Sequence, residues 1–407
     1  MKTNRIARGV AAGFAAIVML GAAPAQAGVI RVSGNGTDSG TCGGDVPCAT
    51  LAQAVANAVD GDVISVGAGA YAGATINKSL SLSSSTGTGG AVITGGVVLS
   101  ANGIQFGRLG KGFSLTGAGT GVSIAADEVV VRGNLFSDAT TGVEVTSGSA
   151  SIVRDNSFDN CTVGVSVLGA TATQVRGNRF GFSNSTAVSL GSSSSMAVIR
   201  ENRTFGPAGS GFVISGSDHL LWRNVVHGSP AGGFTTSGTP TNVELRENLV
   251  VGTDGPGFYL VTGSGWVLDN NAAINVIAPG FYLTAGTPLV LADNVAIGGS
   301  NIGFLIVGGS DHVLTGNSAV QNSSEGIILA TIGSGVTVDG GNLYGNGNGN
   351  CGLTNSSPNT VTANRIYWGD AAGPGADPAD QICGNIPAVV AGSPASVPAK
   401  MKMPPIK

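Results

Sequence analysis

The stretch Val131-Arg132-Gly133-Asn134 recurs along the chain as a short, mostly β-branched segment that ends in asparagine. It returns as Val153-Arg154-Asp155-Asn156, as Val175-Arg176-Gly177-Asn178 and as Ile199-Arg200-Glu201-Asn202. A regular period of this length predicts a stack of equivalent structural units. Eleven such asparagines, spaced by 22 to 25 residues, mark the repeat: Asn134, Asn156, Asn178, Asn202, Asn224, Asn248, Asn270, Asn294, Asn317, Asn342 and Asn364.

A second short segment follows most of these asparagines and usually begins with glycine, as in Gly257-Phe258-Tyr259-Leu260. Its length and its β-branched or aromatic residues predict a strand rather than a helix. A unit of this size cannot bury its own apolar face, so successive coils are expected to stack in register about 4.8 Å apart. Alternation along the strand points the second residue inward. This predicts an internal aromatic stack of Phe212, Phe234, Phe258, Phe281 and Phe304.

The recurring asparagine is predicted to lie at a turn. Asparagine tolerates the left-handed backbone conformation, and its side-chain amide can form a hydrogen-bonded ladder from coil to coil. The alternative, in which these asparagines are ligands, is less favoured because a structural role explains all of them at once.

The asparagine-ended and glycine-led segments resemble the pectate-lyase-like family of right-handed parallel β-helix repeat proteins, over roughly residues 97–370. Residues 47–66 are similar to the usual start of that fold, where a helix caps the open end of the core. Residues 363–369 and the following Gly373-Pro374-Gly375 resemble a frequent closing motif of the family. We expect the capping helix at about residues 49–59, with an apolar stripe at helical spacing. That stripe consists of Leu51, Val55 and Val59, with Ala52 and Ala58.

The resemblance implies an all-β fold, a single-stranded right-handed parallel β-helix or solenoid, over residues 28–387. It does not imply one activity, because the fold hosts lyases, hydrolases, epimerases, adhesins and non-catalytic surface proteins. No metal ion or cofactor is predicted.

The first 27 residues have the parts of a secretory signal peptide. Lys2, Arg5 and Arg8 precede an apolar stretch too short to span a bilayer comfortably, and small residues follow before Gly28. We therefore expect a secreted, extracellular or periplasmic protein with no transmembrane segment after signal cleavage. Loss of the three cations takes the formal net charge from −4 to −7, which disfavours nucleic acid and anionic membranes as partners.

Export places the cysteines in an oxidising compartment, where disulfides form. Cys42 and Cys48 flank a short loop near one end of the chain, and Cys351 and Cys383 lie near the other, so one staple at each end is expected. The sequence does not determine the pairing. Cys161 is left over and is expected to act as a small buried hydrophobe.

Residues 388–407 are rich in proline and alanine and form a C-terminal tail. The sequence allows two interpretations, a disordered segment or a strap against the last coil.

An acidic row and a basic row run side by side at the end of the asparagine-ended segments. We interpret them as a solvated surface of mutually compensating charges, which works against a calcium site. The acidic row is Asp155, Glu201, Glu247, Asp269 and Asp293, and the basic row is Arg132, Arg154, Arg176, Arg200 and Arg246.

Two Asp-His pairs, Asp218-His219 and Asp311-His312, suggest acid–base chemistry. They occupy equivalent places four coils apart, about 19 Å along the axis, so they cannot share one site. We interpret them as turn residues. One local cluster of mixed catalytic types remains, formed by His227 with Asp218, Trp222 and Arg223. The candidate catalytic residues are therefore Asp218, His219, Arg223 and His227.

The third residue of the glycine-led strands forms an outward column: Glu144, Ser166, Ser189, Val213, Thr235, Tyr259, Tyr282, Leu305 and Ile328. Its last four members are aromatic or apolar, as at ligand or partner surfaces. In relatives of known activity this face carries the carbohydrate groove, so the resemblance implies a ligand surface with Tyr259 and Tyr282 as binding residues. The alternative is that the tail, with Val397, Met401 and Met403, covers the column.

These features favour a monomeric, secreted, non-catalytic scaffold that contacts a polysaccharide or a cell-surface partner through the outward column. The alternative is a polysaccharide lyase, hydrolase or epimerase whose catalytic residues the sequence does not identify. A deep groove with converging carboxylates beside Tyr259 favours the enzyme, and a flat, apolar or covered face favours the scaffold.

Overall fold

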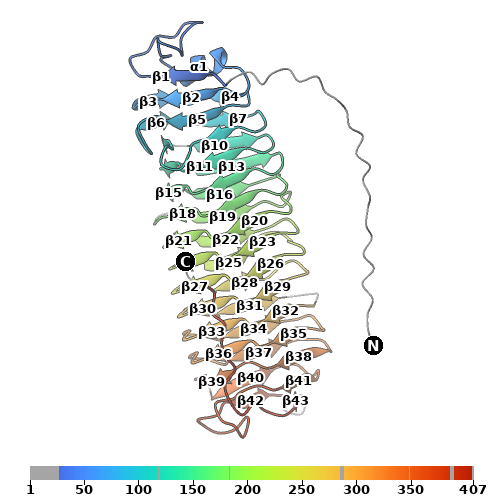
Figure 1. The fold of residues 1–407 in the computed structure, drawn as a ribbon. Coiled ribbons are helices and arrows are strands. Elements are labelled where there is room, and N and C mark those ends of the chain that lie inside the picture. The colour runs from blue at the N-terminus through green and yellow to red at the C-terminus, as the bar shows by residue number, and fades with distance from the viewer. Residues whose placement is uncertain are drawn as a thin grey trace, which may run out of the picture.

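The chain winds as an all-β, right-handed parallel β-helix of about 13 turns (Figure 1), as the sequence predicted. The computed structural model describes residues 27–405 except 118, 183, 285–287, 348 and 386–388. All but the last residue of the predicted signal peptide lies outside the described residues.

Each full coil contributes one short strand to each of three parallel sheets, here named sheets A, B and C in the order in which the chain visits them. Sheet A consists of β1 (Val29–Val32), β2 (Val63–Val66), β5 (Ser81–Ser84), β8 (Gln105–Phe106), β11 (Val130–Arg132), β14 (Ile152–Arg154), β17 (Gln174–Arg176), β20 (Val198–Arg200), β23 (Leu220–Trp222), β26 (Glu244–Arg246), β29 (Val267–Asp269), β32 (Val290–Ala292), β35 (Val313–Thr315), β38 (Val336–Asp339), β41 (Val361–Asn364) and β43 (Val389–Ala391).

Sheet B follows sheet A in each coil, after a turn that contains the recurring asparagine in most coils. It consists of β3 (Gly69–Ala72), β6 (Ala91–Thr94), β9 (Ser114–Thr116), β12 (Leu135–Ser137), β15 (Ser157–Asp159), β18 (Arg179–Phe180), β21 (Arg203–Phe205), β24 (Val225–His227), β27 (Leu249–Val251), β30 (Ala272–Ile274), β33 (Val295–Ile297), β36 (Ser318–Val320) and β39 (Leu343–Tyr344).

Sheet C contains the glycine-led strands and completes each coil. It consists of β4 (Thr75–Ile76), β7 (Val97–Leu99), β10 (Thr120–Ala125), β13 (Thr141–Ser147), β16 (Val163–Val167), β19 (Thr186–Leu190), β22 (Ser210–Ile214), β25 (Gly232–Thr236), β28 (Phe258–Leu260), β31 (Phe281–Thr284), β34 (Phe304–Val307), β37 (Ile327–Ala330), β40 (Cys351–Asn355) and β42 (Gln381–Gly384).

The core is filled by columns of identical or similar side chains. The predicted phenylalanine stack of sheet C is confirmed, with successive ring centroids 4.5 to 5.1 Å apart from Phe212 to Phe304. A second stack, Phe136–Phe158–Phe180 in sheet B, was not predicted. The glycine that leads most of these strands allows a close approach of the coils: a Cβ atom at Gly257 would lie 2.6 Å from the carbonyl oxygen of Gly280.

The asparagine ladder is confirmed in the middle of the helix. Asn178 Oδ1 accepts hydrogen bonds from the backbone N–H and the Nδ2 group of Asn156, at 3.0 and 3.1 Å. The same Nδ2 group donates to the carbonyl of Val131 at 3.0 Å. Each amide is thus used on both sides, at positions that are almost fully buried. The ladder consists of Asn134, Asn156, Asn178, Asn202, Asn224, Asn248, Asn271, Asn294 and Asn317.

Three of the predicted ladder positions are wrong. Asn270 occupies the left-handed turn position, with φ at 53°, and its neighbour Asn271 takes the ladder place. Asn342 lies one residue beyond the ladder register and donates to Ser318 Oγ, while Asn364 lies at the end of β41 in sheet A. A spacing of 22 to 25 residues cannot resolve such one-residue shifts, which only the strand pairing decides.

The capping helix α1 (Leu51–Asn57) is shorter than predicted. Thr50 caps its N-terminus by accepting from the Gln53 N–H, and Lys78 Nζ donates to three carbonyls at its C-terminal end. The predicted apolar stripe is partly wrong. Val59 lies beyond the helix and is 62 % exposed, and Ala52 is also exposed. The buried residues of the helix are Leu51, Ala54 and Val55.

Two disulfides lie at the ends of the solenoid. Cys42 is joined to Cys48 beside α1, and Cys351 is joined to Cys383 between the last two strands of sheet C. Cys161 is free and buried, and its burial raises the pKa of the thiol.

The C-terminal tail forms a strap, here residues 389–405. It begins as β43 at the edge of sheet A and then runs back along the outside of sheet B. Ala399 exchanges two hydrogen bonds with the Asn342 side chain, and Lys402 pairs with Asp293. Met401 packs on an outward apolar cluster of sheet B, which consists of Val225, Leu249, Ala272 and Val295. Because these contacts lie on sheet B, the alternative that the tail covers the outward column of sheet C is wrong.

The adjacent asparagines 270 and 271 provide a test of the ladder. We expect Asn271→Ala to lower the free energy of unfolding by roughly 2–4 kcal/mol, because the Asn248 amide groups and the Leu245 carbonyl lose a buried partner. Asn270→Gly keeps the left-handed turn and is expected to change stability by less than about 0.5 kcal/mol. Urea unfolding measures both. A larger loss of stability in Asn270→Gly than in Asn271→Ala would contradict this register and place the ladder at Asn270.

Candidate functional site

The outward column of sheet C contains a pair of tyrosines on adjacent coils. Tyr259 from β28 and Tyr282 from β31 pair in register, and both are half-buried. Their ring centroids are 5.3 Å apart with an interplanar angle of 64°, an edge-to-face arrangement. Leu305 and Ile328 continue the column on the next two coils. The result is an outward apolar strip on rigid, paired backbone.

The acidic end of the same column is distant from the tyrosines. Glu144 lies on β13, five strands before Tyr259, so the two are separated by about 24 Å along the axis. The intervening outward residues are Ser166, Ser189, Val213 and Thr235. A single sugar ring therefore cannot contact Tyr259 and Glu144 together.

The outward face of sheet A carries a second column, named here the arginine column. It stacks four arginines on consecutive coils, then an aromatic ring and a further arginine. Its members are Arg132, Arg154, Arg176, Arg200, Trp222 and Arg246.

The predicted compensation between acidic and basic rows is found for part of this column. Arg132 pairs with Asp155 at 2.8 Å, Arg200 with Glu201 at 3.1 Å, and Arg246 with Asp269 at 3.4 Å. Two more ion pairs on this surface involve cations outside the predicted basic row, Arg223 with Glu247 and Lys402 with Asp293.

Arg154 and Arg176 depart from this pattern. The Nε atom of each is buried and has no hydrogen-bond partner among the described residues. Burial lowers the pKa of Arg154, and the neighbouring guanidinium groups of Arg132 and Arg176 lower it further.

A groove opens beside the first arginines of the column, with a volume of about 600 Å³. Its polar walls include Arg108, Arg132, Arg154, Gln105 and Ser83, and its described lining contains no carboxylate. Of its three arginines, Arg132 is paired with Asp155, and Arg108 and Arg154 have no ion pair with a described residue.

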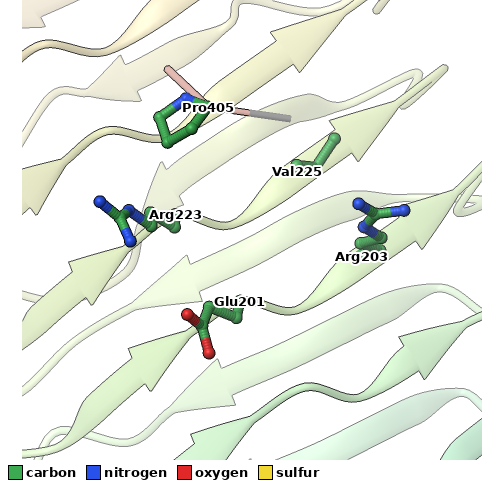
Figure 2. Close-up of a pocket in the computed structure, with 5 residues that line it drawn as sticks. All are labelled: Glu201, Arg203, Arg223, Val225 and Pro405. Atoms are coloured by element: carbon green, nitrogen blue, oxygen red, sulfur yellow. The ribbon is translucent and has the colours of Figure 1, made fainter. Parts of the chain in front are cut away.

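A smaller pocket of about 220 Å³ lies under the end of the strap. Glu201, Arg203, Arg223 and Val225 line it together with Pro405 (Figure 2). Arg223 and Arg203 extend from neighbouring coils on either side, with Pro405 at one end and Glu201 at the other. The last described residue of the chain thus closes part of a charged pocket.

His219 has a structural environment. Its imidazole is buried, Nδ1 accepts from the Ala197 N–H at 3.0 Å, and Nε2 lies 2.8 Å from the Ser215 carbonyl. Together these contacts fix a neutral ring that is protonated at Nε2. His312 repeats the arrangement with Leu289 N–H and the Gly308 carbonyl.

The other candidate catalytic residues lie apart from His219. Asp218 is in the exposed turn before β23 and accepts a hydrogen bond from Asn242 Nδ2. Arg223 follows β23, where its guanidinium lies 4.5 Å over the Trp222 ring and pairs with Glu247. His227 ends β24 and stacks on Phe205 with ring centroids 5.6 Å apart. Burial and the Arg203 charge lower its pKa. The structure thus distributes these residues over two turns, the core and sheet B.

Asp380 is a buried acid that the sequence did not single out. It accepts hydrogen bonds from the Gly345 N–H at 2.9 Å and from Asn346 Nδ2 at 2.7 Å, so it ends a short second ladder of Asn322 and Asn346. Burial raises its pKa.

Within the described ranges, no group of three or more His, Cys, Asp or Glu side chains is arranged to hold a metal ion. None of the helices described there is long and apolar enough to cross a membrane.

Comparison with known families identifies the family to which the repeated coils belong. The family described as "Right handed beta helix region" matches residues 72–180, 94–250 and 163–319, which together cover 248 of the 407 residues. The chain belongs to this family. A search of curated proteins found no match.

Several solved structures are similar in fold to this right-handed beta helix. The catalytic unit of a GH87 alpha-1,3-glucanase from Streptomyces thermodiastaticus is 14% identical, with a TM-score of 0.50, and the match covers 94% of this chain and 72% of that one. An alginate lyase from Paenibacillus sp. is 16% identical over 66% of this chain and 94% of its own, with a TM-score of 0.41. At these identities the likeness concerns the fold alone.

The buried histidine predicts a pH-dependent stability. Burial lowers the pKa of His219 below its ordinary value of 6.5, so the unfolded chain binds the proton more readily than the folded one. The stabilisation by neutral His219 is therefore complete above pH 6.5 and is lost as the pH falls below it. We expect His219→Leu to be roughly 1–3 kcal/mol less stable than the wild type at pH 8, with a smaller difference at pH 5.

Urea unfolding at the two pH values measures this difference. An equal loss at pH 8 and pH 5 would show that protonation of His219 does not oppose folding.

Proposed function

We propose that the protein is a secreted, non-catalytic β-helix scaffold that binds polysaccharide along the outward face of sheet C. Tyr259 and Tyr282 are the proposed contact residues. The observation that carries the proposal is this pair of half-buried tyrosines, in register on adjacent coils, within an apolar strip that the strap leaves open. Secretion is proposed from the signal-like pattern of the first 27 residues.

The tyrosine pair has the physical properties of a sugar-binding surface. Aromatic rings offer large apolar faces at a low cost in side-chain entropy, and tyrosine adds a polar hydroxyl. Neither hydroxyl has a hydrogen-bond partner among the described residues, which leaves both available to a ligand. The paired strands hold the rings in place, so little ordering is required on binding.

The non-catalytic part of the proposal rests on the separation of chemical groups. Glycosidic cleavage by two carboxylates requires them within about 10 Å of each other across the scissile bond. In the outward column of sheet C, Glu144 lies five strands from Tyr259. The candidate residues His219 and His227 lie in the core and on sheet B respectively.

An enzyme acting on polysaccharide is the second candidate function. It is favoured by the fold match to a protein described as the catalytic unit of an alpha-1,3-glucanase. Incubation of the chain with uronate and neutral polysaccharides, with and without calcium, tests it. Release of reducing ends, of unsaturated uronate products, or of an epimerised polymer would replace the scaffold proposal with an enzymatic one.

Removal of the tyrosine rings tests the binding proposal. We expect Tyr259→Ser/Tyr282→Ser to weaken retention on polysaccharide by at least about tenfold, because each exposed stacking contact contributes on the order of 1 kcal/mol. Affinity electrophoresis through gels containing neutral or acidic polysaccharides measures the retention.

Tyr344→Ser is a matched control. Tyr344 forms a similar edge-to-face pair with Tyr367, with centroids 5.7 Å apart, but it lies in sheet B. The control is expected to bind like the wild type. Unchanged retention of the folded double variant, or equal losses in both variants, would refute a binding role for the Tyr259–Tyr282 pair.

A further inference from the structure

The arginine column of sheet A places like charges one coil apart. Arg132, Arg154, Arg176 and Arg200 pair in strict register through β11, β14, β17 and β20. The backbone of neighbouring arginines therefore repeats at the coil spacing of about 4.8 Å, and the charges of Arg132 and Arg176 act unfavourably on the Arg154 guanidinium. Arginine stays charged at neutral pH, so the repulsion cannot be relieved by loss of a proton.

The acidic residues of the adjoining turn compensate only part of this charge. Asp155 follows Arg154 in the sequence, but its carboxylate pairs with Arg132 on the preceding coil. Glu201 pairs with Arg200. The turn positions after Arg132 and Arg176 are glycines, at 133 and 177, which supply no carboxylate. The middle of the column therefore has an excess of two positive charges.

Within the arginine column, Arg154 and Arg176 are the two arginines that have no ion pair with a described carboxylate. Their buried Nε atoms also have no hydrogen-bond partner among the described residues. A buried donor without a partner is costly, and a charged one especially so. Both arginines therefore have positive charge and hydrogen-bonding capacity that the described residues of the chain do not use.

The surrounding surface accommodates such an acceptor. The groove of about 600 Å³ that includes Arg108, Arg132 and Arg154 also presents Ser83 and Gln105 as neutral hydrogen-bonding groups. It lies along the axis of the solenoid, with Arg154 at one end of its lining and Val63 at the other. A linear ligand aligned with the axis would contact the same position of several coils.

We infer that the arginine column binds an anionic polysaccharide, whose acidic groups occupy the unpaired positions at Arg154 and Arg176. A chain of acidic sugars carries one carboxylate or sulfate for every one or two rings, a repeat that a ladder of arginines on successive coils can follow. Arginine binds such planar or tetrahedral anions through two parallel hydrogen bonds. This site goes beyond the proposed function, because it lies on sheet A and does not depend on the tyrosines of sheet C.

Other polyanions fit the same surface less well. Nucleic acids reward basic groups spread over a broad face, whereas this chain is acidic overall. Arg154 and Arg176 lie in a single row, in register on adjacent coils of sheet A. A single linear polysaccharide chain of moderate charge density can align with one row of arginines.

The double variant Arg154→Gln/Arg176→Gln tests the inference. Polygalacturonate, alginate and chondroitin sulfate are the probes, dextran is the neutral comparison, and binding is measured by titration calorimetry at low and physiological salt. We expect the wild type to bind at least one acidic polymer more tightly than dextran, and more weakly as salt rises. The double variant is expected to lose at least about tenfold in affinity.

A charge-matched control separates a site from general electrostatics. Lys400→Gln/Arg365→Gln removes the same number of positive charges from two exposed residues near the C-terminal end. It is expected to keep wild-type affinity within about twofold. Thermal unfolding checks that both variants are folded, and we expect no loss of stability in Arg154→Gln/Arg176→Gln because the removed groups have no partner.

The outcomes that overturn the inference are distinct. Equal losses in both double variants would indicate nonspecific attraction. Absence of wild-type binding to all three acidic polymers would exclude the proposed ligand class, as would tighter binding to single-stranded DNA or to anionic vesicles in parallel titrations. Retention of Arg154→Gln/Arg176→Gln in gels containing a neutral polysaccharide, the proposed ligand of the tyrosine pair, is measured in parallel and is expected to match the wild type, so failure of one site is distinguishable from failure of the other.

Discussion

In-register parallel stacking is the constraint on which the rest of this structure depends. Each coil meets the next at the same position, so a residue type is placed against its own kind along the whole axis. A phenylalanine gains a stacked ring at 4.5 to 5.1 Å, and an asparagine gains an amide acceptor at about 3 Å. Both benefit from repetition, because an aromatic ring offers two faces and an amide both donates and accepts.

The same constraint explains why the sequence predicts the scaffold well. Alternation assigns the inward column of sheet C, and a constant period finds the asparagine turns. Prediction fails where one residue decides the register. The pair Asn270-Asn271 satisfies the spacing equally well at either position, and the strand pairing of Leu249 with Ala272 selects the second. Val59 continues a helical stripe by letter, but the helix has already ended at Asn57.

The surface was less predictable, because it depends on which partner each side chain chooses. Asp155 is adjacent to Arg154 in the sequence and yet pairs with Arg132, since the turn directs its side chain toward the preceding coil. The strap was equally hidden. Its contacts with Asn342 and Asp293 join segments separated by 57 and 109 residues, and no local sequence pattern predicts these contacts. Composition alone favoured a tail without fixed contacts as strongly as a strap.

A repeated residue in a β-helix does not always stabilise the fold. A column of aromatic or amide side chains stabilises itself, but a column of like charges does not, because every added coil adds repulsion. Sheet A largely limits this cost by placing carboxylates in the adjoining turn, as at Asp155, Glu201 and Glu247. Where glycine takes the turn position instead, beside Arg132 and Arg176, the column is under-compensated. The strap covers an apolar part of sheet B, whereas Arg154 and Arg176 lie on sheet A, so it supplies no contact that offsets the repulsion in this part of the column.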